Sequence, residues 1–219
     1  MSGMHEALHV SAQEGAVAAS WKPSVACDVL CSRQQEILHQ IAEPGVAAAI
    51  WQRPVDPDFQ RWIDSLAEDA LPSLRTVVPG HLAKAALLHA CEMAGLESSP
   101  EREFLIEDAG SLALAVGKIL NVRYVRIRLD VTSGTMCPKF HVDQVRARLL
   151  CSYRDAGTEY VAEADAADPA CHKRMATGAV GLFRGARWSD DEICGLLHRS
   201  PHQGEGDAAR LLLVVEPAE

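Results

Sequence analysis

Residues 122–131 read VRYVRIRLDV, and this stretch marks where the chain changes character. Apolar and charged residues alternate in it with a period of two, which is the pattern of a β-strand that buries one face. The same texture returns in QVRARLLCSY at 144–153. It continues in three shorter runs, TEYV at 158–161, GAVGLF at 178–183 and RLLLVVE at 210–216. We therefore expect residues 122–216 to fold as antiparallel strands.

The first half of the chain has a different texture. Asp56 followed by Pro57 predicts the start of a helix, because aspartate caps helices and proline suits their first turn. Segments 81–96 and 100–120 are rich in Ala, Leu and Glu and predict two further helices. A shorter helix is expected after Ser32 as its N-cap, followed by one strand in VAAAIW. This half is thus expected to be mostly helical.

Helices followed by a series of short strands predict an α+β fold, in which a β-sandwich or barrel packs against a helical layer. We expect a flexible tail over residues 1–20 and a single domain over 21–219. Within that domain, 21–121 should form the mainly helical layer and 122–216 the β core.

Composition narrows the possible partners. The 219 residues carry a formal charge of −9 and contain no block of lysines or arginines, which disfavours general binding to nucleic acid. No apolar stretch approaches the roughly 20 residues of a membrane span, and the N-terminal residues lack a basic region followed by an apolar segment, so we expect a cytoplasmic protein. Seven irregularly spaced cysteines indicate reduced thiols. The oligomeric state stays open.

The β-half contains a pattern that points to chemistry. His141 and Asp143 lie two residues apart at the head of the expected strand 139–153, so their side chains should share one face. His198 follows much later, at the end of another short run. Two imidazoles and one carboxylate on one side of a metal leave adjacent positions open, as in non-haem Fe(II) oxygenases.

Arg210 adds a second element to this pattern. It begins the apolar strand RLLLVVE, twelve residues after His198. A guanidinium is a planar fork that can hold the far end of a dicarboxylate co-substrate while the near end chelates iron. The order His-x-Asp, His, Arg therefore favours a site for Fe(II) and a dicarboxylate.

These residues lie within a wider resemblance. Residues 122–216, including TGAVGLFRG, HRSP and RLLLVVE, resemble the double-stranded β-helix core, of jelly-roll or cupin type, of Fe(II)/2-oxoglutarate dioxygenases. The motifs IWQRP, VRIRLDVTSGTMCPKFHVD and RLLCSYRDAGTEY make residues 45–216 similar to a bacterial family known as domain of unknown function 1826. That second resemblance also implies a role under metal limitation.

The dioxygenase resemblance implies roles for individual residues. His141, Asp143 and His198 would bind Fe(II), and Arg210 would pair with the distal carboxylate of 2-oxoglutarate. A hydroxyl from Tyr153 or Ser152 could complete the carboxylate pocket.

Four arginines, at positions 126, 128, 146 and 148, alternate with apolar residues on what we take to be two neighbouring strands. They could form a solvated sheet face paired with Asp and Glu. Alternatively, Arg128 and Arg148 could line a cleft for an anionic small-molecule substrate by binding its phosphate or carboxylate groups.

Two other functional classes remain open from the sequence. Cys137 precedes His141 by four residues and Cys194 precedes His198 by four, so these residues could form a closed Cys2His2 zinc site. A non-catalytic zinc or metal-binding protein linked to metal homeostasis is therefore the alternative function. An interaction module whose cleft has lost its chemistry is the third.

Overall fold

The structure is a computed structural model that describes residues 23–134, 137–204 and 207–218. The flexible tail expected over residues 1–20 lies outside this described part. Across the described residues, no helix is long and apolar enough to cross a membrane.

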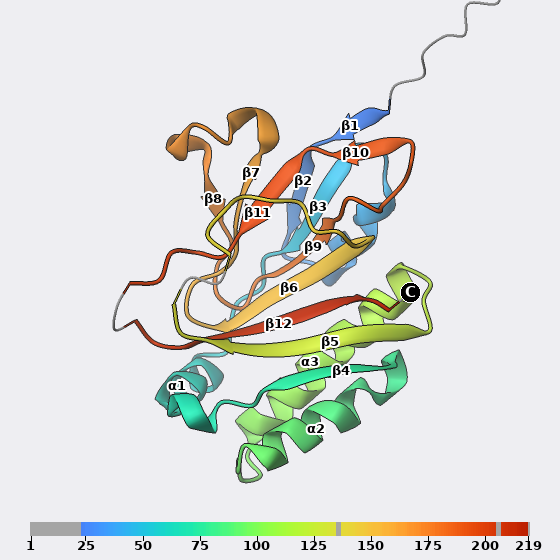
Figure 1. The fold of residues 1–219 in the computed structure, drawn as a ribbon. Coiled ribbons are helices and arrows are strands. Elements are labelled where there is room, and N and C mark those ends of the chain that lie inside the picture. The colour runs from blue at the N-terminus through green and yellow to red at the C-terminus, as the bar shows by residue number, and fades with distance from the viewer. Residues whose placement is uncertain (1–22, 135–136, 205–206, 219) are drawn as a thin grey trace, which may run out of the picture.

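The strands form one large sheet, one small sheet and a separate pair (Figure 1). Within the described residues, the large sheet has seven strands, in the order β2 Asp28–Ser32, β3 Val46–Trp51, β9 Val180–Arg184, β6 Ala147–Arg154, β12 Arg210–Pro217, β5 Tyr124–Thr132 and β4 Leu74–Pro79. The small sheet has the order β11 Leu196–Arg199, β7 Glu159–Ala162 and β8 Lys173–Arg174. The pair consists of β1 Ser24–Ala26 and β10 Glu192–Cys194, which run parallel.

The α-helices cover one face of the large sheet (Figure 1). They are α1 Pro57–Ser65, α2 Ala83–Met93 and α3 Pro100–Ile119. Short 3-10 helices fill several connections, namely η1 Gln35–Ala42, η2 Glu68–Ala70, η3 Gly80–Leu82, η4 Glu163–Asp165 and η5 Pro169–Cys171.

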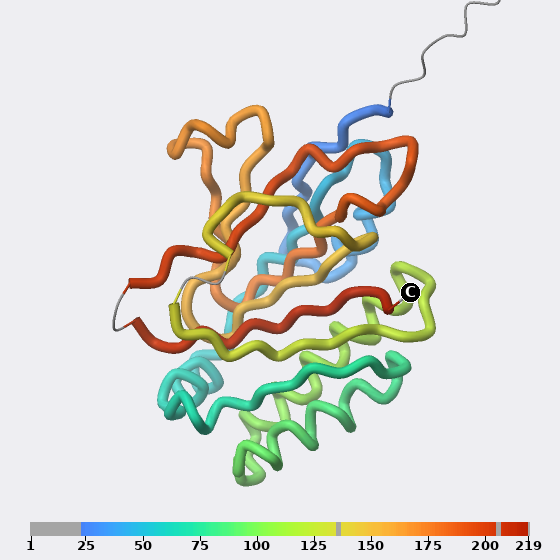
Figure 2. Tube along the Cα trace, viewed as in Figure 1, coloured from blue at the N-terminus to red at the C-terminus, as the bar shows by residue number. Residues whose placement is uncertain are grey.

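The C-terminal strands alternate between the two sheets. β5, β6, β9 and β12 belong to the large sheet, where β12 pairs with β5 and β6, and β6 with β9. β7, β8 and β11 belong to the small sheet, and His141 joins its edge through a single bridge to His198 of β11. Figure 2 shows this yellow segment running beside the orange-red β11. The chain therefore passes back and forth between the two sheets as it builds the β core.

Alternation along the strands gives the large sheet two different faces. On β5, Val125, Ile127 and Leu129 are fully buried and pack in the core that includes α3. Leu150 of β6 and Val214 of β12 point to the other face and pack in a second core shared with the small sheet. The α+β class expected from the sequence is confirmed.

Most of the expected elements are confirmed at the level of individual residues. Asp56 caps α1, because its Oδ1 accepts hydrogen bonds from the backbone N–H groups of Asp58 at 2.8 Å and Phe59 at 3.1 Å. The strand in VAAAIW is β3, and the alanine-rich segments form α2 and α3. The alternating runs after residue 122 form β5, β6, β7, β9 and β12.

The first half is less purely helical than expected. Residues 21–121, which were expected to form the helical layer, also supply β2 and β4 to the large sheet. The short helix after Ser32 is the 3-10 helix η1, and Ser32 ends β2 rather than capping an α-helix. Its hydroxyl instead accepts a hydrogen bond from the N–H of Gln34 at 3.0 Å.

Two expectations about the β-half were wrong. The strand expected over 139–153 begins only at Ala147, so His141 and Asp143 precede β6. The arginine-bearing strands β5 and β6 are not neighbours, because β12 lies between them and pairs with both. The C-terminal strand β12 thus inserts between two strands that precede it in the sequence.

Candidate active site

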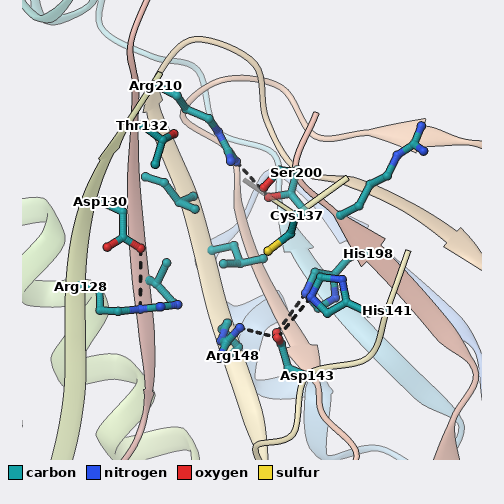
Figure 3. Close-up of a pocket in the computed structure, with 15 residues that line it drawn as sticks. Arg128, Asp130, Thr132, Cys137, His141, Asp143, Arg148, His198, Ser200 and Arg210 are labelled. Atoms are coloured by element: carbon teal, nitrogen blue, oxygen red, sulfur yellow. Dashed lines mark hydrogen bonds and ion pairs between the residues drawn. The ribbon is translucent and has the colours of Figure 1, made fainter. Parts of the chain in front are cut away.

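A cavity of about 190 Å³ opens between the large and small sheets. It brings together residues that are far apart in the sequence, as Figure 3 shows. Its lining includes His141, Asp143, His198, Arg210, Arg128, Arg148, Asp130, Thr132, Thr158, Cys137 and Ser200.

Backbone pairing holds the two histidines together. The N–H of His141 donates to the carbonyl of His198 at 3.0 Å, and the N–H of His198 donates back to the carbonyl of His141 at 3.0 Å. The imidazole centroids are 4.8 Å apart. The bridge, rather than the expected strand, therefore positions His141, and it places both imidazole rings on the cavity wall.

The loop after β9 holds Asp143 in place. The N–H of Ala186 donates to the carbonyl of Asp143 at 2.8 Å. Gly185 lies so close to this segment that an added Cβ would come within 2.0 Å of the carbonyl oxygen of Val145 and 2.8 Å of that of Asp143. This close approach explains why the motif after β9 requires glycine at this position.

Three side chains converge from these backbones. Nε2 of His198 lies 2.9 Å from Oδ2 of Asp143, and Nε2 of His141 lies 3.5 Å from Oδ1 of the same carboxylate. One potential ligand atom from each residue lies within 4.8 Å of the others. Among the described residues, this is the one group of three or more such side chains that could hold a metal ion.

The polar atoms of this cluster have the state that metal ligands require. Nδ1 of His141 lies 2.9 Å from the carbonyl oxygen of Lys139. Because a carbonyl only accepts, Nδ1 carries the proton, which leaves a lone pair on Nε2 in the neutral ring. Oδ2 of Asp143 is buried and has no hydrogen-bond partner, with Nε2 of His198 2.9 Å away. A cation between these atoms would satisfy both.

Asp143 is buried yet remains a carboxylate. Burial alone would raise its pKa, but the neighbouring His198 and Arg148 outweigh burial and hold the pKa below its usual value. Arg148 donates from Nη1 to Oδ1 of Asp143. It also donates from Nε and Nη2 to Oε2 of Glu216, at 2.9 and 2.6 Å. Arg148 therefore orients Asp143, and each of its three guanidinium nitrogens already donates to a carboxylate.

Arg210 lies at another end of the same cavity (Figure 3). Its side chain donates to the hydroxyl of Ser152 at 2.8 Å, to the carbonyl of Ala156 at 3.0 Å and to the hydroxyl of Thr158 at 3.3 Å. These acceptors are all neutral, and no carboxylate of the described residues forms an ion pair with Arg210. Arg210 is only 3% exposed, and this burial lowers its pKa to about 10. A buried cation without a carboxylate partner is a favourable place for an anionic ligand.

The two hydroxyl residues considered for the carboxylate pocket, Ser152 and Tyr153, point to opposite faces of β6. Ser152 lies beside Arg210, whereas Tyr153 points to the opposite face of β6, where its hydroxyl donates to Oδ2 of Asp108 at 2.6 Å. Thr158, which also contacts Arg210, was not predicted from the sequence because it belongs to no recognisable motif. Only the pairing of β7 with β11 brings it near the cavity.

The Cys2His2 arrangement does not form. Cys137 lines the cavity, but Cys194 is buried elsewhere, and its thiol donates to the carbonyl of Leu196 at 3.5 Å. Because β10 and β11 follow one another around Gly195, Cys194 packs in the second core instead of facing the cavity. The closed Cys2His2 zinc site considered from the sequence was therefore wrong.

A family model described as "Protein of unknown function (DUF1826)" matches residues 32–216. The chain belongs to the DUF1826 family. This match confirms the family resemblance seen in the motifs and extends it toward the N-terminus, to β2. The IWQRP motif of this DUF1826 member ends β3 and leads to Arg53, which pairs with Asp108 at 2.5 and 2.7 Å. No curated protein matches the chain.

Several solved structures are similar to this DUF1826 protein at low identity. The dioxygenase for auxin oxidation 1 from Arabidopsis thaliana, in a binary complex with 2-oxoglutarate, is 10% identical, with a TM-score of 0.45 and coverage of 86% of this chain and 91% of that one. A prolyl-4-hydroxylase from Pseudomonas putida is 12% identical, with a TM-score of 0.42 and coverage of 84% and 98%. The rice dioxygenase for auxin oxidation is 15% identical, with a TM-score of 0.43 and coverage of 86% and 81%. Because these TM-scores are all below 0.5, the activity of this protein has to be inferred from its own residues.

Proposed function

We propose that the protein is an Fe(II)- and 2-oxoglutarate-dependent oxygenase built on a double-stranded β-helix. One observation carries this proposal: a cluster of two histidines and one carboxylate shares a single cavity with a buried arginine that has no carboxylate partner among the described residues. A protein that only stored metal would have no use for the second feature.

The donor set supports iron as the metal. His141, Asp143 and His198 would hold it through two imidazole nitrogens and one carboxylate oxygen, which is the facial ligand set of non-haem Fe(II) oxygenases. When bound, the metal would use dioxygen to couple oxidation of a substrate C–H bond to decarboxylation of 2-oxoglutarate, with one oxygen atom going to the substrate and the other to succinate as CO2 leaves. The chain's own contribution would be to orient the ligands and to shield the site from water.

Arg210 supports 2-oxoglutarate as the co-substrate. The distal carboxylate would pair with the guanidinium and accept a hydrogen bond from Ser152 or Thr158, both of which are buried. That ion pair would compensate the buried positive charge. The primary substrate would be a small molecule that enters the remaining part of the cavity.

Arg148 provides a test of the metal centre through its orienting contact. Arg148→Gln should lower Fe(II) affinity by about 10- to 100-fold, because Asp143 would lose its partner and turn more freely. Arg126→Gln is a matched control, since Arg126 also pairs with Glu216, at 2.8 Å, but Asp143 is not among its partners. Metal competition titrations would measure both. Equal affinities for the two variants would show that Arg148 has no orienting role.

The proposal is tested by calorimetry without oxygen. Wild-type protein loaded with Fe(II) should bind 2-oxoglutarate, and metal-free protein should bind it more weakly, because chelation of the metal adds to the contact with Arg210. Failure of the Fe(II)-loaded wild type to bind 2-oxoglutarate would favour the non-catalytic metal-binding alternative.

A further inference from the structure

The large sheet carries a concentration of positive charge beside the proposed iron site. Four arginines, Arg75, Arg126, Arg128 and Arg148, come from β4, β5 and β6. On this face Arg126 and Arg148 share Glu216, and Arg148 also pairs with Asp143, whereas Arg75 and Arg128 share Asp130. This excess of positive charge is notable in a chain whose formal charge is −9.

Arg128 and Arg75 are incompletely paired. Arg75 lies directly opposite Arg128 in the antiparallel pair of β4 and β5, so the two guanidinium groups share one face. Like charges at such positions destabilise a sheet unless an anion lies between them. Asp130 offers only long contacts, 3.7 Å from Nε of Arg128 and 3.9 Å from Nη2 of Arg75. Nε of Arg128 is buried without a hydrogen-bond acceptor.

Arg128 lies between two neighbouring cavities and lines both of them. It lines the cavity that holds the histidine cluster, and it also lines a neighbouring shallow hollow with Arg75 and Arg126. Figure 3 places Arg128 and Asp130 on the wall across the cavity from His141 and His198, away from Arg210. A molecule whose reacting carbon lies near the metal could therefore reach Arg128 without competing for Arg210.

We propose that Arg128 and Arg75 form an acid-binding subsite for the primary substrate, which is then a small molecule bearing a carboxylate or a phosphate. This inference rests on the proposed function and deepens it. The acid group accepts from Nε of Arg128 and from the exposed guanidinium of Arg75, and it adds a second negative charge to that of Asp130, whose contacts with this cross-strand pair are long. The substrate is small because its reacting part has to fit a cavity of about 190 Å³.

The subsite can be tested by side-chain NMR without turnover. Protein labelled with ¹⁵N, loaded with Zn²⁺ and saturated with 2-oxoglutarate is titrated separately with sodium acetate, inorganic phosphate and sodium chloride at equal ionic strength. The Nε–H signal of Arg128, assigned by its loss in Arg128→Gln, should shift saturably with acetate or phosphate and not with chloride. The anion that binds more tightly identifies which acid group the substrate carries.

Variants separate this subsite from a general charge effect. Arg75→Gln should weaken binding of the preferred anion by about tenfold, because one charged hydrogen bond is lost. Arg75 is 71% exposed, so this variant should fold normally. Arg61→Gln is the matched control, since Arg61 is 72% exposed and lies on α1.

The outcomes distinguish this inference from the proposed function. Calorimetry on the same sample first reports whether 2-oxoglutarate binds. If it binds but neither acetate nor phosphate shifts Arg128 saturably, or if Arg75→Gln and Arg61→Gln behave alike, the subsite is refuted while the oxygenase proposal stands. If 2-oxoglutarate does not bind but the anions do, the subsite stands and the oxygenase proposal falls.

Discussion

Replacing Asp143 by asparagine is expected to reduce Fe(II) affinity by more than about 100-fold, a larger loss than any change outside the ligand set should cause. The substitution keeps the shape of the side chain but removes the only negative charge in the cluster. Two neutral imidazoles and an amide would then have to balance a divalent cation in a site where Asp143 is only 6% exposed. Metal competition titrations and metal analysis of the purified protein would measure the loss.

Asp130→Asn is the matched control for this experiment. Asp130 lines the same cavity and carries the same charge, but it lies across the cavity, beside Arg128 (Figure 3). Fe(II) affinity should remain close to that of the wild type. If both substitutions reduced affinity equally, the cavity would attract metal through its general charge, and the proposed ligand set would be wrong.

Replacing Arg210 by methionine is expected to weaken 2-oxoglutarate binding to the Fe(II)-loaded protein by on the order of 100-fold, equivalent to about 3 kcal/mol for a buried charge pair. Fe(II) affinity should be unchanged, because Arg210 is not part of the metal cluster. Anaerobic calorimetry of both ligands would measure these effects. A parallel loss of metal affinity would show that the variant has disturbed the whole cavity.

The same substitution should spare the stability of the ligand-free protein. Burial lowers the pKa of Arg210 well below the usual value of an arginine, to about 10, so the charged side chain costs on the order of 3 kcal/mol of folding free energy. Because the folded-state pKa is the lower one, this cost is fully present at neutral pH and is relieved only as the pH rises through about 10. Methionine removes the cost but leaves Ser152 and Thr158 without their donor. The free energy of unfolding should therefore change by less than about 1 kcal/mol.

Denaturant unfolding of the wild type and of Arg210→Met would measure this balance. A loss of several kcal/mol would mean that Arg210 is a structural residue whose hydrogen bonds hold β6 to the loop before β7. Little change in stability combined with a large loss of 2-oxoglutarate affinity is the signature of a residue retained for binding.

The sequence was most informative where chemistry depends on few residues. His141, Asp143, His198 and Arg210 could be selected from residue type and order, and the structure brings them into one cavity. The reasoning about geometry was less accurate, because His141 and Asp143 do not lie on a strand. A two-residue spacing still places them together, because the bridge between His141 and His198 holds the segment extended.

The sequence could not decide between Ser152 and Tyr153 because it does not show which face of β6 is directed toward the cavity. Consecutive residues on a strand point to opposite faces, so only one of them could reach Arg210. Arg148 faces the cavity, and Ser152 lies four residues further along the same strand. Their even separation would have selected Ser152 if the direction of Arg148 had been known.

Strand β4 was missed because its sequence gives a weak signal. It lies between helices, ends at Pro79 and forms an edge of the large sheet, where a short strand needs only one partner. Without β4, the sequence gives no reason to select Arg75. The pairing of β4 with β5 is a long-range contact, and the position of Arg75 opposite Arg128 follows only from that register.

The most direct test of the account is the visible spectrum of Fe(II)-loaded protein on addition of 2-oxoglutarate without oxygen. A keto acid that chelates the iron while Arg210 holds its far carboxylate should produce a weak metal-to-ligand charge-transfer band. That band should be absent from Asp143→Asn and should require much more 2-oxoglutarate in Arg210→Met. Admission of oxygen should bleach the band with release of succinate. A wild-type protein that binds both iron and 2-oxoglutarate by calorimetry, yet shows no such band, would contradict binding of the two at one centre.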